Sequence, residues 1–136
     1  VQNGEYGYIY NPFSDGTYWY RNNNEGKTMA AMNEAAKTDP AIAARIALFR
    51  YRVPEELYDL QKDPDCLENL IDNPAHRKTI ELLQSRLVEQ MKKTQDPMLA
   101  AFQHRDDRAA VDKVLVKTYG PQKPPRKRRK KNSKKQ

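Results

Sequence analysis

Few side chains in this sequence have the type and spacing that catalysis requires. Cys66 is the only thiol among the 136 residues, and His76 and His104 are the only imidazoles. A nucleophilic thiol or hydroxyl needs a basic group beside it. Cys66 lies in a turn-forming stretch where a small buried residue fits, and the two histidines lie near the ends of expected helices, where solvent-facing roles are typical. We therefore assign no catalytic residue in this chain.

Carboxylates gather in two clusters that invite a metal-site interpretation. Asp59, Asp63 and Asp65 are spaced by four and two residues, and Asp106 and Asp107 are adjacent. No glycine-centred calcium loop and no histidine partner accompany them. A strand end, a helix cap and an exposed first turn account for the first three aspartates. We expect no metal site and no cofactor in this chain.

The sequence also lacks the features that acid–base catalysis, nucleotide binding and cysteine-based sites require. Glu55 and Glu56 could serve in acid–base catalysis only beside a cleft, and the sequence defines none. The five glycines are scattered singly through turns and chain ends, so no glycine-rich loop is present to bind a nucleotide phosphate. The single cysteine excludes an intrachain disulfide and a multi-cysteine metal site.

The positive charge of the chain is concentrated at one end. The formal net charge is +7, yet nine of the 25 Lys and Arg residues lie in residues 121–136, which contain no acid. The remaining 16 basic residues face 18 acidic ones, so residues 1–120 carry a net charge of −2. A segment with one sign of charge and almost no apolar residues is typical of disorder. Its candidate polyanion-binding residues are Lys123, Arg126, Lys127, Arg128, Arg129, Lys130 and Lys131.

The patterning predicts an α+β fold in which a small antiparallel sheet packs against helices. Tyr6, Tyr8 and Tyr10 alternate with other residues as in a strand, so we expect a hairpin near residues 5–21 and a further strand near 55–60. These tyrosines belong to an aromatic-rich start of the chain, which could pack the sheet against helices or offer a platform to sugars or bases. We favour the packing role.

Two helix starts are marked by a side-chain acceptor followed by proline. Asp39 and Asn73 each precede a proline, a combination that caps a helix and suits its first turn. We expect helices over residues 41–50 and, as the longest, near 74–94. No stretch approaches the roughly 20 consecutive apolar residues of a membrane-spanning helix. The sequence therefore predicts no membrane-spanning segment.

The chain divides into three parts by composition. Residues 1–105 hold the expected sheet and main helices and form one subdomain. Residues 106–120 form a weakly structured linker or a helix, because the apolar residues that could pack against the subdomain are mainly Val111 and Leu115. Residues 121–136 form the disordered Lys/Arg-rich tail.

One continuous segment carries a family resemblance. Residues 52–64 read RVPEELYDLQKDP and are followed by Asn69 and Leu70. This pattern resembles the C-terminal region of type I, formylglycine-dependent sulfatases, in which a sheet strand runs into a turn and then a long helix. YIYNPFSDG at 8–16 and TQDP at 94–97 are similar to the N-sulfoglucosamine sulfohydrolase-like branch. The motif residues are Pro54, Glu55, Glu56, Leu57, Tyr58, Asp59, Leu60, Asp63, Pro64, Asn69 and Leu70.

The resemblance implies a parent enzyme that hydrolyses sulfuric esters or sulfamates on sulfated sugars in a secreted, periplasmic or lysosome-like location. In that family a cysteine or serine in a C/S-x-P-S-R motif becomes formylglycine, and Asp, Asn and His residues bind calcium. Cys66 is followed by Leu67, Glu68 and Asn69, so it does not fit that motif. The calcium and formylglycine belong to the family's larger N-terminal domain, which we expect to precede this chain as its partner.

The resemblance thus predicts a C-terminal subdomain that supports the catalytic domain, walls its substrate pocket and is inactive alone. The basic tail would then contact sulfated polysaccharide. The alternative is a small module that binds nucleic acid or another polyanion through residues 121–136. Strongly salt-dependent nucleic-acid binding that disappears with the tail would favour this alternative.

Overall fold

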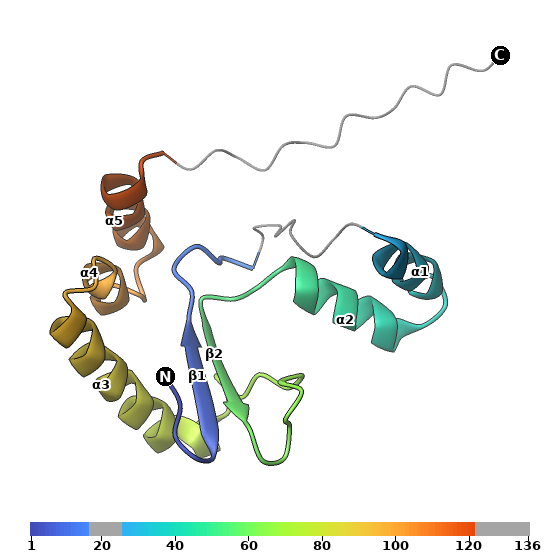
Figure 1. Ribbon diagram of the computed structural model, residues 1–136, viewed down its shortest axis with the longest axis horizontal. Helices are drawn as coiled ribbons and strands as arrows, with labels where there is room; N and C mark the ends of the chain where they lie inside the picture. The colour runs from blue at the N-terminus through green and yellow to red at the C-terminus, as the bar shows by residue number, and fades with distance from the viewer. Residues whose placement is uncertain (17–25, 122–136) are drawn as a thin grey trace.

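The computed structural model describes residues 1–16 and 26–121, which form one small sheet and several helices (Figure 1). Strand β1 (Tyr6–Tyr10) pairs antiparallel with β2 (Glu55–Asp59), so that Tyr8 lies opposite Leu57. The α+β class expected from the sequence is thereby confirmed. The second strand of the expected hairpin lies outside the described residues, as do the candidate polyanion-binding residues of the tail.

The described residues form the two expected helices and further helical segments. They are α1 (Lys27–Ala35), α2 (Pro40–Arg50), the 3-10 turn η1 (Pro74–His76), α3 (Arg77–Thr94), α4 (Leu99–Gln103) and α5 (Arg108–Tyr119). Both expected caps are confirmed, because the side chain of Asp39 accepts hydrogen bonds from backbone N–H groups of the first turn of α2, and that of Asn73 accepts one in η1. Prolines follow both caps, where no backbone donor is lost.

The core lies between the sheet and helices α3, α4 and α5. The Phe102 ring from α4 makes edge-to-face contacts with Tyr8 and Tyr10, at centroid distances of 6.4 and 4.9 Å. The packing role expected for the described aromatic residues of β1 is therefore confirmed. The buried core residues are Tyr8, Leu57, Leu83, Met91, Met98, Ala101, Phe102, Val111 and Leu115.

Residues 106–120, expected to be a linker or a helix, contain the well-packed helix α5. Val111 and Leu115 are buried in the shared core. Asp107 caps the helix, and Arg108 donates hydrogen bonds to the carbonyl oxygens of Pro12 and Ser14, at 3.0 and 2.9 Å. This pair of bonds fastens the loop after β1 to α5 and fixes the direction in which the chain leaves the sheet.

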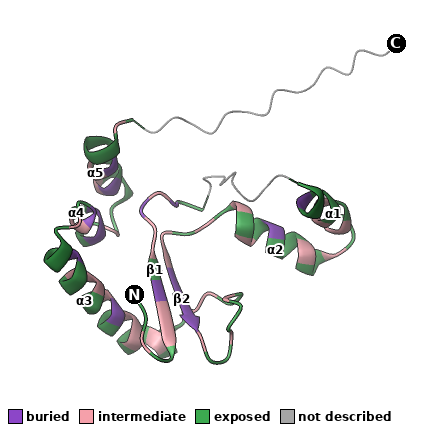
Figure 2. Ribbon diagram, in the orientation of Figure 1, coloured by how far each residue is buried: buried purple, intermediate pink, exposed green. Residues whose placement is uncertain are grey.

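Helices α1 and α2 pack against each other, and Figure 1 shows the pair apart from α3, α4 and α5. Met29 of α1 and Ile46 of α2 are buried, whereas Phe49 of α2 is exposed. Figure 2 shows that most of the surface of this pair is exposed or half-buried. Among the described residues, no helix combines the length and the apolar character that a membrane crossing requires.

Candidate functional site

Glu55, at the first position of β2, is the centre of a polar cluster formed by β1, β2, α3 and the segment between α4 and α5. The register places its side chain on the helix-covered face of the sheet, beside Tyr8 of β1. Its carboxylate accepts hydrogen bonds from the Tyr8 hydroxyl and, at 2.8 Å, from the Gln84 amide of α3. Arg105, between α4 and α5, lies 3.5 Å from the same oxygen and also donates to the Gln84 carbonyl oxygen at 3.3 Å.

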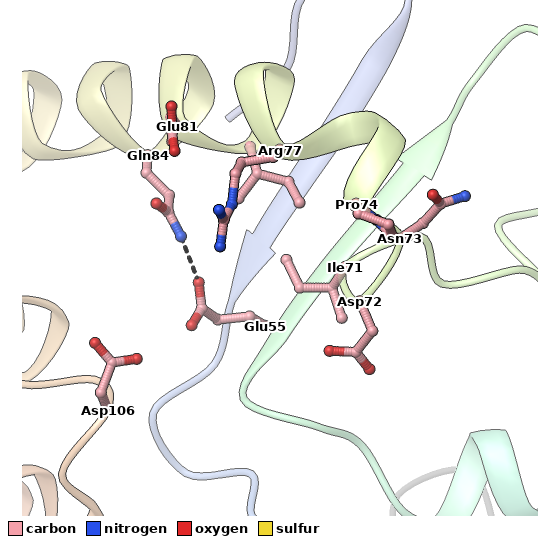
Figure 3. Close-up of a pocket in the computed structure, with 10 residues that line it drawn as sticks. Glu55, Ile71, Asp72, Asn73, Pro74, Arg77, Glu81, Gln84 and Asp106 are labelled. Atoms are coloured by element: carbon pink, nitrogen blue, oxygen red, sulfur yellow. Dashed lines mark hydrogen bonds between the residues drawn. The ribbon is translucent and has the colours of Figure 1, made fainter.

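A cleft of about 650 Å³ opens beside this cluster, between α3, the start of β2 and the loop before η1. In Figure 3 the side chains of Glu55, Arg77 and Asp106 extend toward the space of the cleft. Within the described part of the chain, no hydrogen bond or ion pair engages the Arg77 guanidinium. The lining residues are Glu55, Ile71, Asp72, Asn73, Pro74, Arg77, Ile80, Glu81, Gln84 and Asp106.

The cleft can bind polar groups, and its described residues do not form a nucleophile–base pair. The carboxylate and amide oxygens of Glu55 and Gln84 are acceptors for hydroxyl or amine donors, and Arg77 is a donor for an anionic group. Neither histidine lines it. The sequence did not define this cleft, because the loop at residues 71–74 and α3, which form it, are distant from Glu55 in sequence.

Sequence reasoning also missed Gln84, Arg77 and Arg105. A signal for Gln84 was present, because it falls four residues after Ile80 on the stripe of α3 that faces the sheet. A polar residue on an otherwise apolar stripe needs a hydrogen-bonding partner in the interior. The sequence contains no comparable signal for the two arginines.

Asn69 closes the outer edge of β2. Its side-chain oxygen accepts hydrogen bonds from the N–H groups of Leu57 and Ile71, at 2.9 and 3.1 Å, and its amide donates to the Glu55 carbonyl oxygen at 3.3 Å. The Leu70 N–H donates to the Leu57 carbonyl oxygen at 2.8 Å. The Asn69 side chain and the Leu70 N–H thus bond to the backbone groups at this edge of β2, to which another strand would otherwise bond.

Glu56 forms a second polar group on the sheet face opposite the helices. Only 2% of its side chain is exposed, and its carboxylate accepts hydrogen bonds from Arg52 and, at 3.0 Å, from the Tyr58 hydroxyl. A buried carboxylate requires such partners, because burial removes its hydration. Arg52 therefore compensates the charge of Glu56.

The aspartates of the motif hold turns. Asp59 accepts hydrogen bonds from the N–H groups of Lys62 and Gln61, and the bond from Lys62 is the main cause that holds the pKa of Asp59 below its ordinary value. Asp63 accepts hydrogen bonds from Leu67 and Glu68 at 2.7 and 2.8 Å. Within residues 1–16 and 26–121, no group of three or more His, Cys, Asp and Glu side chains is placed to hold a metal ion.

The structure does not bring the remaining candidates together into a site. Cys66 is half-buried in the turn after β2, where its φ is 53°. His76 ends η1 with its ring 5.5 Å from that of Tyr6, so it is partly packed, which differs from the solvent-facing position expected. His104 is exposed at the end of α4.

Three tyrosines have raised pKa values because they are buried beside carboxylates. Burial is the main cause at each, followed by Glu55 for Tyr8 and Tyr10, and by Glu56 for Tyr58. The pKa of Tyr8 is raised well above its ordinary range, and those of Tyr10 and Tyr58 are raised to about 12. These three hydroxyl groups stay protonated in the folded protein at a pH where those of the unfolded chain ionise.

We expect the folded protein to lose stability steeply above about pH 10, the ordinary pKa of tyrosine. Because the folded-state pKa values are raised, the stabilisation is fully present below the unfolded pKa and disappears as the pH rises through the folded values. Each well-buried tyrosine that stays protonated should contribute about 1.4 kcal/mol per pH unit to the decline. Circular dichroism and phenolate absorbance, followed together from pH 9 to pH 12, test this.

Tyr58→Phe is the matched variant for this titration, since it removes one ionisable group and leaves a ring of similar size. Its free energy of unfolding should fall less steeply with pH than that of the parent. If all phenolates appeared near pH 10 while the fold persisted, the buried placement of these tyrosines would be wrong.

Comparisons with protein-family models, with curated proteins and with solved structures return no match to this chain.

Proposed function

We propose that this chain is the C-terminal subdomain of a sulfatase-family hydrolase that acts on sulfated sugars. Its role is to support the catalytic domain and to form one wall of the substrate pocket. The N-terminal domain supplies the nucleophile and the cation that stabilises the developing negative charge. The chain alone is inactive.

The observation that carries this proposal is the way in which the motif residues build one structural unit. Asn69 and Leu70 close the edge of β2, and Asp63 caps the turn that separates them from the strand. The chain then enters η1 and α3, which packs back on the sheet. Strand, turn and long helix thus follow one another as the resemblance implies, with a structural reason for the spacing of the motif.

The cleft beside Glu55 supports the role as a pocket wall. A sulfated sugar offers hydroxyl groups and an anionic group, and the cleft offers acceptors at Glu55 and Gln84 and a guanidinium at Arg77. Arginine is well matched to a tetrahedral oxyanion, because its donors form a planar fork. The basic tail of residues 121–136 adds attraction for a sulfated polysaccharide at low ionic strength.

The coding sequence upstream of Val1 gives the direct test. We expect it to encode C/S-x-P-S-R and the acidic residues of a calcium site. The full-length product should release sulfate from a sulfated sugar in multiple turnovers, and the chain of residues 1–136 should release none. An upstream sequence without that motif, or turnover by a rigorously pure sample of the isolated chain, would contradict the proposal.

A further inference from the structure

The edge of β1 that faces away from β2 already holds the beginning of another strand. Val1 and Tyr8 form a reciprocal backbone pair, with N–H to O=C distances of 3.0 and 2.8 Å. Gln2 lies opposite Gly7 in an antiparallel bridge, and the Asn3 N–H donates to the Tyr6 carbonyl oxygen at 3.0 Å. Figure 1 shows the N-terminus beside β1, on the side opposite β2. Residues 1–3 therefore pair with the first half of β1.

Among residues 1–16 and 26–121, nothing pairs with the second half of that edge at Tyr10. In an antiparallel pair, alternate residues direct their backbone N–H and C=O groups to the same neighbour. Glu5 and Asn11 bond toward β2, through Leu60 and Pro54 respectively. The backbone of Tyr10 must therefore face the other edge, and no described residue occupies its N–H or C=O group there.

The two edges of the sheet thus differ in how they end. Beyond β2, Asn69 and Leu70 satisfy the edge groups, which leaves no place for a further strand at Leu57. Beyond β1, residues 1–3 pair with the edge as far as Tyr8, and no described residue continues this pairing to Tyr10. Ile9 of β1, on the sheet face opposite the helices, is 43% exposed.

We infer that β1 is an interior strand, and that the polypeptide which precedes Val1 continues along it as an antiparallel third strand. The inference rests on the proposed function, which places a domain upstream. The existing register sets the contacts: the residue immediately before Val1 lies opposite Ile9, and the second residue before Val1 forms a reciprocal backbone pair with Tyr10. The catalytic domain is then joined to this subdomain through a strand of the same sheet rather than through a loose linker.

A designed extension tests this without knowledge of the natural upstream sequence. Five residues of high strand propensity, Thr-Val-Thr-Val-Thr, are added before Val1 of the whole 136-residue chain. We expect a melting temperature several degrees higher, and amide exchange at Tyr10 slowed roughly three- to tenfold, as one added backbone hydrogen bond would produce. Nuclear magnetic resonance measures the exchange residue by residue.

Two proline variants of the extension provide the matched control. Proline at the second position before Val1 removes the N–H that would donate to the Tyr10 carbonyl oxygen. The increase in melting temperature and the slower exchange at Tyr10 should therefore disappear. Proline immediately before Val1 should keep most of the gain, because the N–H at that position points to solvent.

Unchanged exchange at Tyr10, or equal effects of the two prolines, would overturn the inference. A dimer in analytical ultracentrifugation whose formation alone protects Tyr10 would overturn it too, since a second copy would then occupy the edge. A natural upstream sequence without sulfatase motifs would contradict the proposed function but would leave these measurements unaffected.

Discussion

Replacing Asn69 by alanine is expected to lower the free energy of unfolding by about 2 to 4 kcal/mol. The substitution removes the acceptor for the N–H groups of Leu57 and Ile71 and the donor to the Glu55 carbonyl oxygen. Leu57 is fully buried, so water cannot readily replace the lost partner. Urea unfolding followed by circular dichroism measures the change.

Asn73→Ala is the matched control for Asn69→Ala. Asn73 is also an asparagine that accepts a backbone hydrogen bond, from Ala75, but it is exposed at the start of η1. Its loss should cost only about 1 kcal/mol, the usual value for a helix cap. Equal effects of the two substitutions would mean that Asn69 does not close the edge of β2.

We expect Arg52→Met to cost about 2 to 4 kcal/mol, because it leaves the carboxylate of Glu56 buried without its cation. The value lies toward the lower end for an unpaired buried charge, since 31% of the Arg52 side chain is exposed and Tyr58 still donates to Glu56. Methionine preserves much of the apolar length of arginine, so the decrease in the free energy of unfolding comes mainly from the lost charge.

Two further variants separate the loss of the ion pair from a general effect of the substitution. The double variant Arg52→Met, Glu56→Gln removes the charge and keeps an acceptor for Tyr58, so it should regain more than half of the lost stability. Lys37→Met breaks an exposed ion pair with Glu34 and should cost less than about 0.5 kcal/mol. A double variant no more stable than Arg52→Met alone would show that Arg52 acts through packing.

The local features of the fold could be predicted because they depend on neighbouring residues. Asp39 and Asn73 cap the turns that follow them, and the alternating tyrosines at 6–10 form a strand. In each case the interaction spans only a few residues, so the residue types specify it.

The pairing of the sheet could not be predicted in the same way. The tyrosine strand was expected to pair with a nearby strand in a hairpin, and its described partner is Glu55–Asp59, far away in the sequence. Many pairings satisfy the same alternation of residue types, and the choice among them depends on which side chains pack together in the folded core. Phe102 and Leu83 are buried against this sheet and help to select this pairing.

The sequence alone determined the α+β class, the helix starts and the separation of charge between body and tail. Only the tertiary structure decided that Glu55, Gln84 and Arg105 meet beside a cleft, and that no described residue pairs with the outward backbone groups of Tyr10. The physical reason is the distance along the sequence between the residues that interact. Caps and periodicity depend on neighbours within a few residues, whereas clefts and edges arise only when distant segments pack and leave some groups unoccupied.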